Sequence, residues 1–350
     1  MNRELCKLFN VDLLNKYEKF VKMFNTNMEV IKFLPSHLEK EYLYDLELTK
    51  KSLEEKDEKS YRELFLKHVE LLKSLQSFNL NSLAFKAFIE IEKNESIKNN
   101  LSSFNDKRNQ NIVYELTSTI SGRMIVKNGP NILTLPNRCR KIFNSKWTNN
   151  GKLLSVDFKN LEPRVVKKIL GDNVAYDIYN EILDQLEFKN EIDRSLIKKA
   201  VISVMYGKTS PIEGISTERS NIILEKTRDY FKLDSILEKA SHIKNEEYRT
   251  NYFGRPIHNK NEESSHKIIN NFVQSTAVDI ALSYFYELTE SMKDLNVRPL
   301  FLIHDAIVFD VHNDDFKEFV NRVNEGYNNK DLGYFPVEIT NFTNGEKLIA

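Results

Sequence analysis

The sequence predicts an α+β protein, with a helical N-terminal lobe followed by a part that contains a β-hairpin. Before residue 106, charged and apolar residues alternate at helical spacing. Glycine and proline then cluster between Gly122 and Pro136, a change in turn chemistry that indicates a boundary. Apolar runs at 152–157 and 300–311 have the composition of strands.

The N-terminal lobe is expected to consist of long helices. Its clearest helical pattern runs from Lys50 to Leu80, where apolar residues recur near the helical period. A chain of 350 residues exceeds the usual size of one domain. We therefore predict a helical lobe over residues 1–105 and a second region over residues 106–350.

Composition leaves most function classes open. Basic and acidic residues number 51 each, so any contact with nucleic acid must come from local clusters of charge. Cys6 and Cys139 form neither a disulfide framework nor a zinc-type spacing, which favours a reducing compartment. No signal-type segment or bilayer-length apolar run is present. The sequence predicts a cytoplasmic protein without a membrane partner.

The first candidate motif is LLSVDFKNLEPRVV, in which a buried-type strand runs into Asp157. Glu162 and Pro163 then indicate a helix start, because proline suits the first helical turn. A carboxylate at a strand end is a common metal ligand. The alternative is that Asp157 is a cap or turn residue.

The second motif is DRSLIKKAVISVMYG, which places Arg194, Lys198, Ile202 and Tyr206 on one helical face before Gly207. A solvated basic helix is the alternative, although the apolar end of the segment favours a cleft. The guanidinium suits a triphosphate, the ammonium can protonate leaving pyrophosphate, and the aromatic ring can support a base.

The third motif is LFLIHDAIVFDV, with His304 and Asp305 at a hairpin turn between two apolar strands. If Asp305 faced Asp157, the two carboxylates would repel each other unless cations bridged them. Two divalent ions a few ångström apart are what in-line phosphoryl transfer requires. The motifs together therefore predict a two-metal site.

In this order the segments resemble motifs A, B and C of family A DNA polymerases, the bacterial DNA polymerase I type. Motif A is matched by Asp157, Glu162 and Arg164; motif B by Arg194, Lys198, Tyr206 and Gly207; motif C by His304 and Asp305. Ile202 stands where the family usually has an aromatic residue, and Ala306 stands where motif C has glutamate.

Weaker similarities extend the resemblance to about residues 115–345. They are carried by TSTISGRMIVKNGPNILTLPN, TNYFGRPI and NNFVQSTAVDIA. The resemblance implies that a set of residues contacts the primer–template, namely Arg123, Arg255, Asn270, Gln274 and His304.

The resemblance implies a right-hand polymerase fold. An antiparallel palm sheet would carry the two aspartates, fingers would lie at about residues 170–250, and the N-terminal helices would form a thumb-like lobe. The short spacing between motifs A and B predicts trimmed fingers. About 105 residues before the Gly122-Arg123 segment leave no room for an exonuclease domain, so proofreading is expected to be absent.

The implied activity is template-directed addition of dNTPs to a primer 3′ end, in replication or repair in a bacterial or phage-infected cell. Two Mg²⁺ ions, replaceable by Mn²⁺, would be held by Asp157, Asp305 and the backbone carbonyl of Phe158. Lys198 would join both aspartates as a catalytic residue. The remaining implied nucleotide-binding residues are Arg194, Ile202, Tyr206, Glu162 and Tyr179, the last at the place of a phosphate-contacting histidine.

Two departures from the family shape the expectations. Ala306 removes an accessory carboxylate, so weaker metal binding with retained activity is expected, and Ile202 bears on sugar discrimination and nucleotide affinity. Single-subunit RNA polymerases of the phage type are an alternative, but they place a small residue where Glu162 stands. A non-catalytic nucleic-acid-binding protein is another alternative. A small thumb favours a processivity or replication partner, which no motif identifies.

Overall fold

The structure, a computed structural model, describes Lys19, Met23 and residues 59–105, 111–208, 210–242, 248–258 and 264–348. The chain divides into two compact units, Met1–Glu63 and Leu64–Ala350, and all the motifs lie in the second. Of the thumb-like helical lobe predicted over residues 1–105, residues 1–58 other than Lys19 and Met23 lie outside the described residues.

Residues 64–105 belong to the second unit. This region contains most of α4 (Lys59–Ser74), then β1 (Asn79–Leu80), α5 (Ser82–Ile91) and α6 (Glu95–Ser103). Phe78 and Phe104 pack edge-on against Phe143, with ring centroids 5.4 Å away in both cases. β1 also pairs with β4 (Phe143–Asn144), so the two parts share one core.

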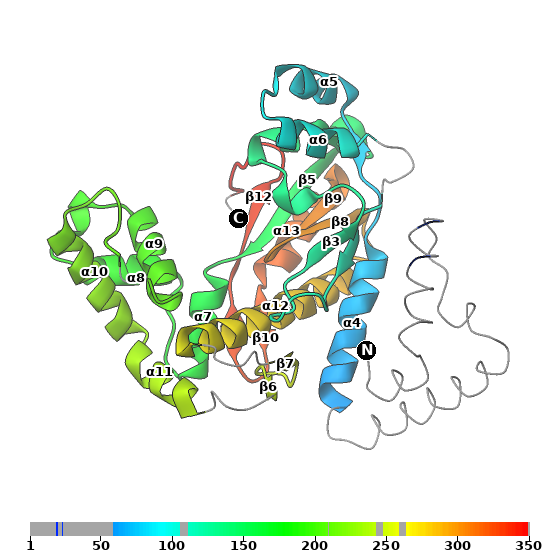
Figure 1. Cartoon of the computed structure of the whole chain (residues 1–350). Helices are drawn as coiled ribbons and strands as arrows, with labels where there is room; N and C mark the ends of the chain where they lie inside the picture. Colours follow the sequence, from blue (N-terminus) through cyan, green and yellow to red (C-terminus); the bar gives the residue numbers. More distant parts are fainter. Residues whose placement is uncertain are drawn as a thin grey trace. The chain divides into compact units, whose positions relative to one another are not determined.

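The centre of the second unit is a four-stranded antiparallel sheet with the order β12-β5-β9-β8 (Figure 1). Its strands are β5 (Gly151–Phe158), β8 (Val297–Ile303), β9 (Ala306–His312) and β12 (Val337–Asn341). The strand predicted at 152–157 and the hairpin predicted at 300–311, interrupted at His304 and Asp305, are both present. β-branched and aromatic residues dominate these strands and fill the core.

One face of the sheet is covered by α12 (Ser265–Ser291) and α13 (Phe316–Asn324). The Phe158 ring lies 5.3 Å from that of Tyr284 in α12, and the Phe309 ring lies 5.5 Å from that of Phe319 in α13. On the opposite face, a cluster of phenylalanines around Phe301 covers one end. The other end of that face carries Asp157 and is left open to a cavity.

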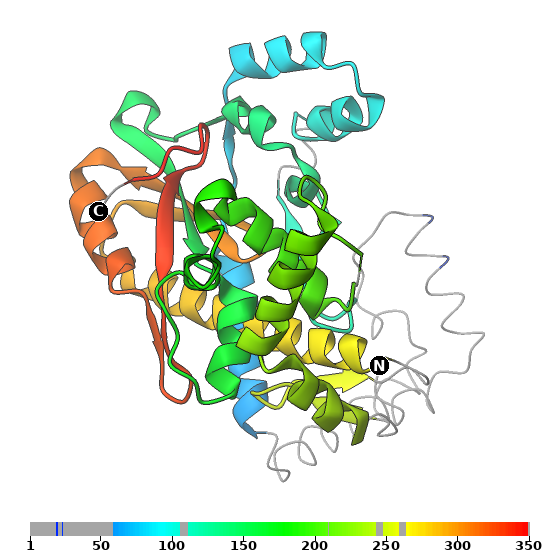
Figure 2. The same ribbon diagram turned by 90° about the vertical axis from the view of Figure 1, so that its left-hand side faces the viewer.

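The helices that follow β5 and precede α12 in the sequence lie to one side of the sheet (Figures 1 and 2). They are α7 (Leu161–Ile169), α8 (Ile178–Asp184), α9 (Arg194–Met205), α10 (Thr217–Tyr230) and α11 (Leu233–His242). Asp177, Asp193 and Ser216 cap α8, α9 and α10 by accepting hydrogen bonds from first-turn amides. Helices α8–α11 lie in the segment expected to form the fingers.

The remaining elements are short. They are β2 (Val113–Glu115), β3 (Ile125–Asn128), η2 (Ile132–Thr134), η3 (Asn137–Ile142), η4 (Thr148–Asn150), η5 (Lys189–Glu191), β6 (Tyr248–Thr250), β7 (Pro256–His258), η6 (Asn313–Asp315), β10 (Tyr327–Asn329) and β11 (Gly333–Phe335). Across the described ranges, every helix is too short or too polar to cross a bilayer.

Candidate active site

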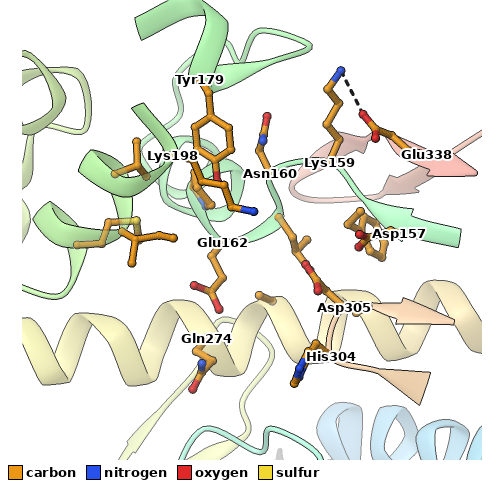
Figure 3. Close-up of a pocket in the computed structure, with 18 of the residues that line it drawn as sticks. Asp157, Lys159, Asn160, Glu162, Tyr179, Lys198, Gln274, His304, Asp305 and Glu338 are labelled. Atoms are coloured by element: carbon orange, nitrogen blue, oxygen red, sulfur yellow. Dashed lines mark ion pairs between the residues drawn. The ribbon is translucent and has the colours of Figure 1, made fainter. Parts of the chain in front are cut away.

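Asp157 and Asp305 meet at the open end of the sheet (Figure 3). In the ladder between β5 and β9, Asp157 lies opposite Ala306, the residue after Asp305. The Phe158 amide donates to the Asp305 carbonyl over 3.5 Å, which ties the end of β5 to the hairpin turn. Both carboxylates line a cavity of about 620 Å³.

The two carboxylates are exposed at the cavity wall, and no cation among the described residues lies close enough to pair with either of them. Partial desolvation in the cavity raises the pKa of both, and the charges of Asp305 and Glu338 raise the pKa of Asp157 further, opposed by Lys198. Within the described part of the chain, neither aspartate forms an ion pair. A bound cation would relieve the repulsion between these like charges.

Helix α9 presents its basic face to the same cavity, where Lys198, Ile202 and Tyr206 remain exposed. Arg194, Lys198, Ile202 and Tyr206 all line the cavity. The opposite face of the helix is packed in the core through Ile197, Ala200, Val201 and Val204. The predicted spacing of four residues therefore brings these side chains together on one cavity wall.

Arg194 is held by two contacts at the cavity wall. Its Nε donates to the Asp177 carboxylate over 3.0 Å, and its guanidinium lies 4.7 Å from the centre of the Tyr179 ring. Burial raises the pKa of Tyr179 to about 12, so this phenol is neutral at physiological pH. The neutral ring therefore supports the cation that the sequence predicts to bind phosphate.

Gly207 ends the basic helix with a backbone φ of 72°. A Cβ at this position would lie 2.7 Å from the His266 ring of α12. Glycine is required here both by the left-handed conformation and by this close approach. The contact fixes the end of α9 against α12, with Tyr206 still on the cavity wall.

Glu162, in the first turn of α7, faces the cavity between the basic helix and α12. Burial raises the pKa of its carboxyl, whereas the Arg123 charge and a hydrogen bond from Gln274 lower it. The Gln274 side chain also accepts a hydrogen bond from the Ser121 hydroxyl over 2.5 Å. Glu162 and Gln274 are thus joined in one polar network on the cavity floor.

Arg123 and His304 meet at the rim of the cavity. Arg123 Nη2 lies 3.2 Å from His304 Nδ1. Burial and the Arg123 charge lower the pKa of His304, so the imidazole is neutral and Nδ1 can accept from the guanidinium. His304 has a φ of 56°, which turns the chain sharply before Asp305.

Two predicted primer–template residues lie away from the cavity. Asn270 is partly exposed on α12, one turn before Gln274, and is not among the cavity-lining residues. Arg255 is only 6% exposed and is paired with Asp279 inside the protein. A guanidinium in this position is packed in the interior rather than presented to a ligand.

Four charged cavity residues were not identified from the sequence: Lys159, Asp177, Glu338 and Lys347. Lys159 Nζ lies 3.5 Å from carboxylate oxygens of both Asp177 and Glu338, and Lys347 pairs with Glu338 over 2.7 Å. Strand alternation from Asp157 could have indicated Lys159, and helix capping could have indicated Asp177. Glu338 is placed by its register opposite Asp157, which no local pattern indicates.

Comparison with known families and structures gives a consistent result. A family model described as DNA polymerase family A matches residues 12–340. No curated protein matches the sequence.

Solved structures of 113 chains resemble this one, among them the POL domain of Pol1 from M. smegmatis in complex with DNA primer-template and dNTP. That match has a TM-score of 0.58 and 18% identity, and it covers 72% of this chain. The chain spans 52% of the length of that domain. At this identity the likeness shows a shared fold.

Proposed function

This chain belongs to DNA polymerase family A, and we propose that it is a template-directed DNA polymerase that adds dNTPs to a primer 3′ end. The observation that carries the proposal is a single cavity lined by the carboxylates of Asp157 and Asp305 and by the cations of Arg194 and Lys198. Two carboxylates opposite two cations suit the transfer of a nucleotidyl group from a triphosphate.

Two Mg²⁺ ions, or Mn²⁺ in their place, fit the cavity chemistry. Asp157, Asp305 and the Phe158 carbonyl would hold them. The described residues include no group of three His, Cys, Asp or Glu side chains arranged for a metal. Mg²⁺ suits such a sparse site, since it usually binds through one or two carboxylates, water and substrate phosphates. When bound, the ions would activate the primer hydroxyl and neutralise charge on the triphosphate.

The basic helix would bind the triphosphate. Arg194, already oriented by Asp177 and the Tyr179 ring, would bind phosphate oxygens bidentately. Lys198 would donate a proton to the leaving pyrophosphate. Tyr206, which is 46% exposed at the end of α9, would border the nascent base pair.

Glu162 supports the choice of deoxynucleotides. Its carboxylate occupies the cavity floor beside Gln274, where it would crowd the 2′ position of the incoming sugar. RNA synthesis, the alternative in the same class, would require space at this point. Ile202 lies on the facing helix and would pack against the sugar with less contact area than an aromatic residue.

The primer–template would lie across the rim formed by Arg123, Gln274 and His304, with Asn270 one helical turn away on α12. We expect synthesis by residues 12–340, the part that the family model matches, to proceed without proofreading. A processivity or replication partner is a further expectation.

Extension of a labelled primer on a DNA template, with Mg²⁺ and either dNTPs or rNTPs, tests this proposal. We expect the primer to be extended with dNTPs but not with rNTPs. We also expect no nucleotides to be removed from a labelled 3′ end. Extension only with rNTPs would assign RNA synthesis. Duplex binding without extension, with Mg²⁺ or Mn²⁺, would assign a non-catalytic DNA-binding protein.

A further inference from the structure

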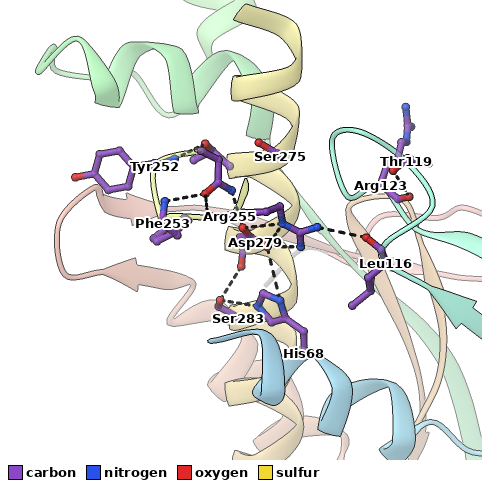
Figure 4. Close-up of polar contacts among 12 residues, drawn as sticks. His68, Leu116, Thr119, Arg123, Tyr252, Phe253, Arg255, Ser275, Asp279 and Ser283 are labelled. Atoms are coloured by element: carbon purple, nitrogen blue, oxygen red, sulfur yellow. Dashed lines mark hydrogen bonds and ion pairs between the residues drawn. The ribbon is translucent and has the colours of Figure 1, made fainter. Parts of the chain in front are cut away.

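A buried charge cluster lies on the side of α12 away from the cavity. It contains Asp279, Arg255 and His68 (Figure 4), and Asn251 joins it through a hydrogen bond to Asp279. We propose that Arg255 and Asp279 are positioning residues that hold the Thr119–Arg123 turn and so orient Arg123 toward the primer–template. The inference rests on the proposed function, since it assigns a cause to one of the DNA contacts of that site.

The pair at the centre of the cluster is fixed by multiple hydrogen bonds. Asp279 is fully buried, and Arg255 donates to its carboxylate from Nη2 over 2.6 Å and from Nε over 3.2 Å. Asn251 donates to the second carboxylate oxygen over 2.6 Å. A forked, charge-assisted contact of this kind defines the plane of the guanidinium.

The far side of the same guanidinium supports the turn. Arg255 Nη1 lies 3.4 Å from the Leu116 carbonyl oxygen. At Gly122, which has a φ of 70°, an added Cβ would lie 1.7 Å from that Nη1. The guanidinium therefore packs directly on the backbone one residue before Arg123, where no other side chain can intervene.

The turn in contact with Arg255 leads directly to the cavity rim. The Gly122 amide donates to the Thr119 carbonyl over 3.1 Å, and the Thr119 hydroxyl donates to the Arg123 carbonyl over 2.9 Å. The Arg123 side chain then reaches His304, the neighbour of Asp305. A continuous path of contacts thus joins Asp279 to the rim through Arg255 and the turn.

The chemistry of the cluster favours a positioning role over a contribution to stability alone. Replacing a buried ion pair by apolar residues is often neutral for stability, so the pair by itself is weak support for a stabilising function. The pair instead fixes the orientation of the turn, because an apolar side chain in place of the guanidinium would make no directional contact with the turn backbone. His68 is neutral, since burial lowers its pKa to about 3, and so adds no second cation to the cluster.

Arg255→Lys tests the inference, because lysine keeps the charge but loses the fork that contacts both Asp279 and the turn. DNA affinity is measured by fluorescence anisotropy of a labelled primer–template without divalent ions or nucleotide. We expect about fivefold weaker binding, within the usual coupling of contacting residues. The matched control is Arg298→Lys, which alters another arginine–aspartate pair, the half-buried Arg298 with the buried Asp310 at 3.3 Å, and should leave DNA affinity unchanged.

A double-mutant cycle separates positioning from general damage. If Arg255 acts through Arg123, Arg255→Lys should weaken DNA binding in the wild-type background and cause no further loss in an Arg123→Ala background. Equal losses in both backgrounds, or an equal loss from Arg298→Lys, would overturn the inference. Thr119→Val loosens the turn without touching the core and should show the same dependence on Arg123, even if Arg255→Lys folds poorly.

Amide hydrogen exchange separates failure of this inference from failure of the proposed function. Arg255→Lys should speed exchange of the Gly122 amide, while amides of β5 and β9 remain protected. Unchanged exchange at Gly122 would overturn the inference whether or not the protein binds DNA. A wild-type protein that fails to bind primer–template would instead refute the proposed function, and the exchange measurement would then decide the inference alone.

Discussion

Carboxylates in two regions of the molecule differ in both solvent exposure and pairing. In the cavity, Asp157 lies near the like charges of Asp305 and Glu338. Neither Asp157 nor Asp305 forms an ion pair with any described residue. Behind α12, Asp279 is fully buried and receives hydrogen bonds from Arg255 and Asn251. The same residue type is therefore electrostatically frustrated in one region and satisfied in the other.

The difference indicates what each region is built for. Like charges held close together without a cation destabilise the folded chain, and they persist where a ligand supplies the missing charge. A buried charge with saturated hydrogen bonds instead fixes the geometry of its surroundings. Substitutions that remove charge should therefore have opposite consequences in the two regions.

The largest expected effect is on activity in the cavity. Asp305→Asn keeps the shape of the side chain but halves the charge of the aspartate pair. A metal contributes several kcal/mol to phosphoryl transfer, so we expect primer extension to fall by about a thousandfold or more. Primer–template affinity should change little, because phosphate contacts dominate it. Extension at the wild-type rate would refute the assignment of Asp305.

Lys198→Ala should have the next largest effect. Loss of a general acid typically costs about 10²–10⁴-fold in rate, so kcat should fall by that order in single-turnover extension. Lys199→Ala is the matched control, since Lys199 is the next residue on α9 but does not line the cavity. Equal rates for the two variants would show that catalysis does not depend on the cavity-facing position of Lys198.

Removing a carboxylate charge should change the free energy of unfolding in opposite directions in the two regions. Asp279→Asn leaves the buried Arg255 without its counter-charge, which typically costs about 3–5 kcal/mol. Asp157→Asn removes a carboxylate whose pKa is raised by burial and by like charges, so without divalent ions it should raise the melting temperature. Thermal unfolding in a chelator measures both. A melting temperature for Asp157→Asn below that of the wild-type protein would contradict the proposed difference between the two regions.

The interior cluster should also make folding stability depend on pH through His68. Burial, assisted by the charges of Arg255 and Lys67, lowers the pKa of His68 from 6.5 to about 3. Below pH 6.5 the unfolded chain therefore takes up a proton that the folded chain does not, and stability falls as pH falls toward 3. His68→Gln should flatten this part of the curve of melting temperature against pH. An unchanged slope would contradict a neutral buried His68.

The smallest expected effect is at Ile202, which is 46% exposed on the cavity wall. Ile202→Phe adds aromatic contact worth about 0.5–1.5 kcal/mol, which corresponds to a KM for dNTP about twofold to tenfold lower. Steady-state kinetics with one dNTP gives KM and kcat separately. A change in kcat with KM unaltered would place the side chain away from the sugar.

Local patterns predicted the elements that carry the site. The apolar run before Asp157 gave the strand, the interruption at His304 and Asp305 gave the hairpin turn, and spacing of four residues gave the cavity face of α9. These features depend on strand alternation and helical period, which short segments encode fully.

The role of Arg255 and the wider charge network could not be predicted in this way. A motif showed that an arginine follows Gly254, but only packing shows that Asp279, on a different element, holds it inside the protein. Lys159 and Glu338 likewise meet because β5 and β12 pair, although the two residues are far apart in sequence.

The sequence by itself therefore determined the α+β class, the motif elements and the chemical types at the cavity. The tertiary structure decided which charges remain unpaired: Asp157 and Asp305 face one another, whereas Asp279 meets Arg255. The physical reason is that the state of a buried charge depends on neighbours brought together by sheet register and helix packing. Those contacts are long-range, and no local pattern of residues specifies them.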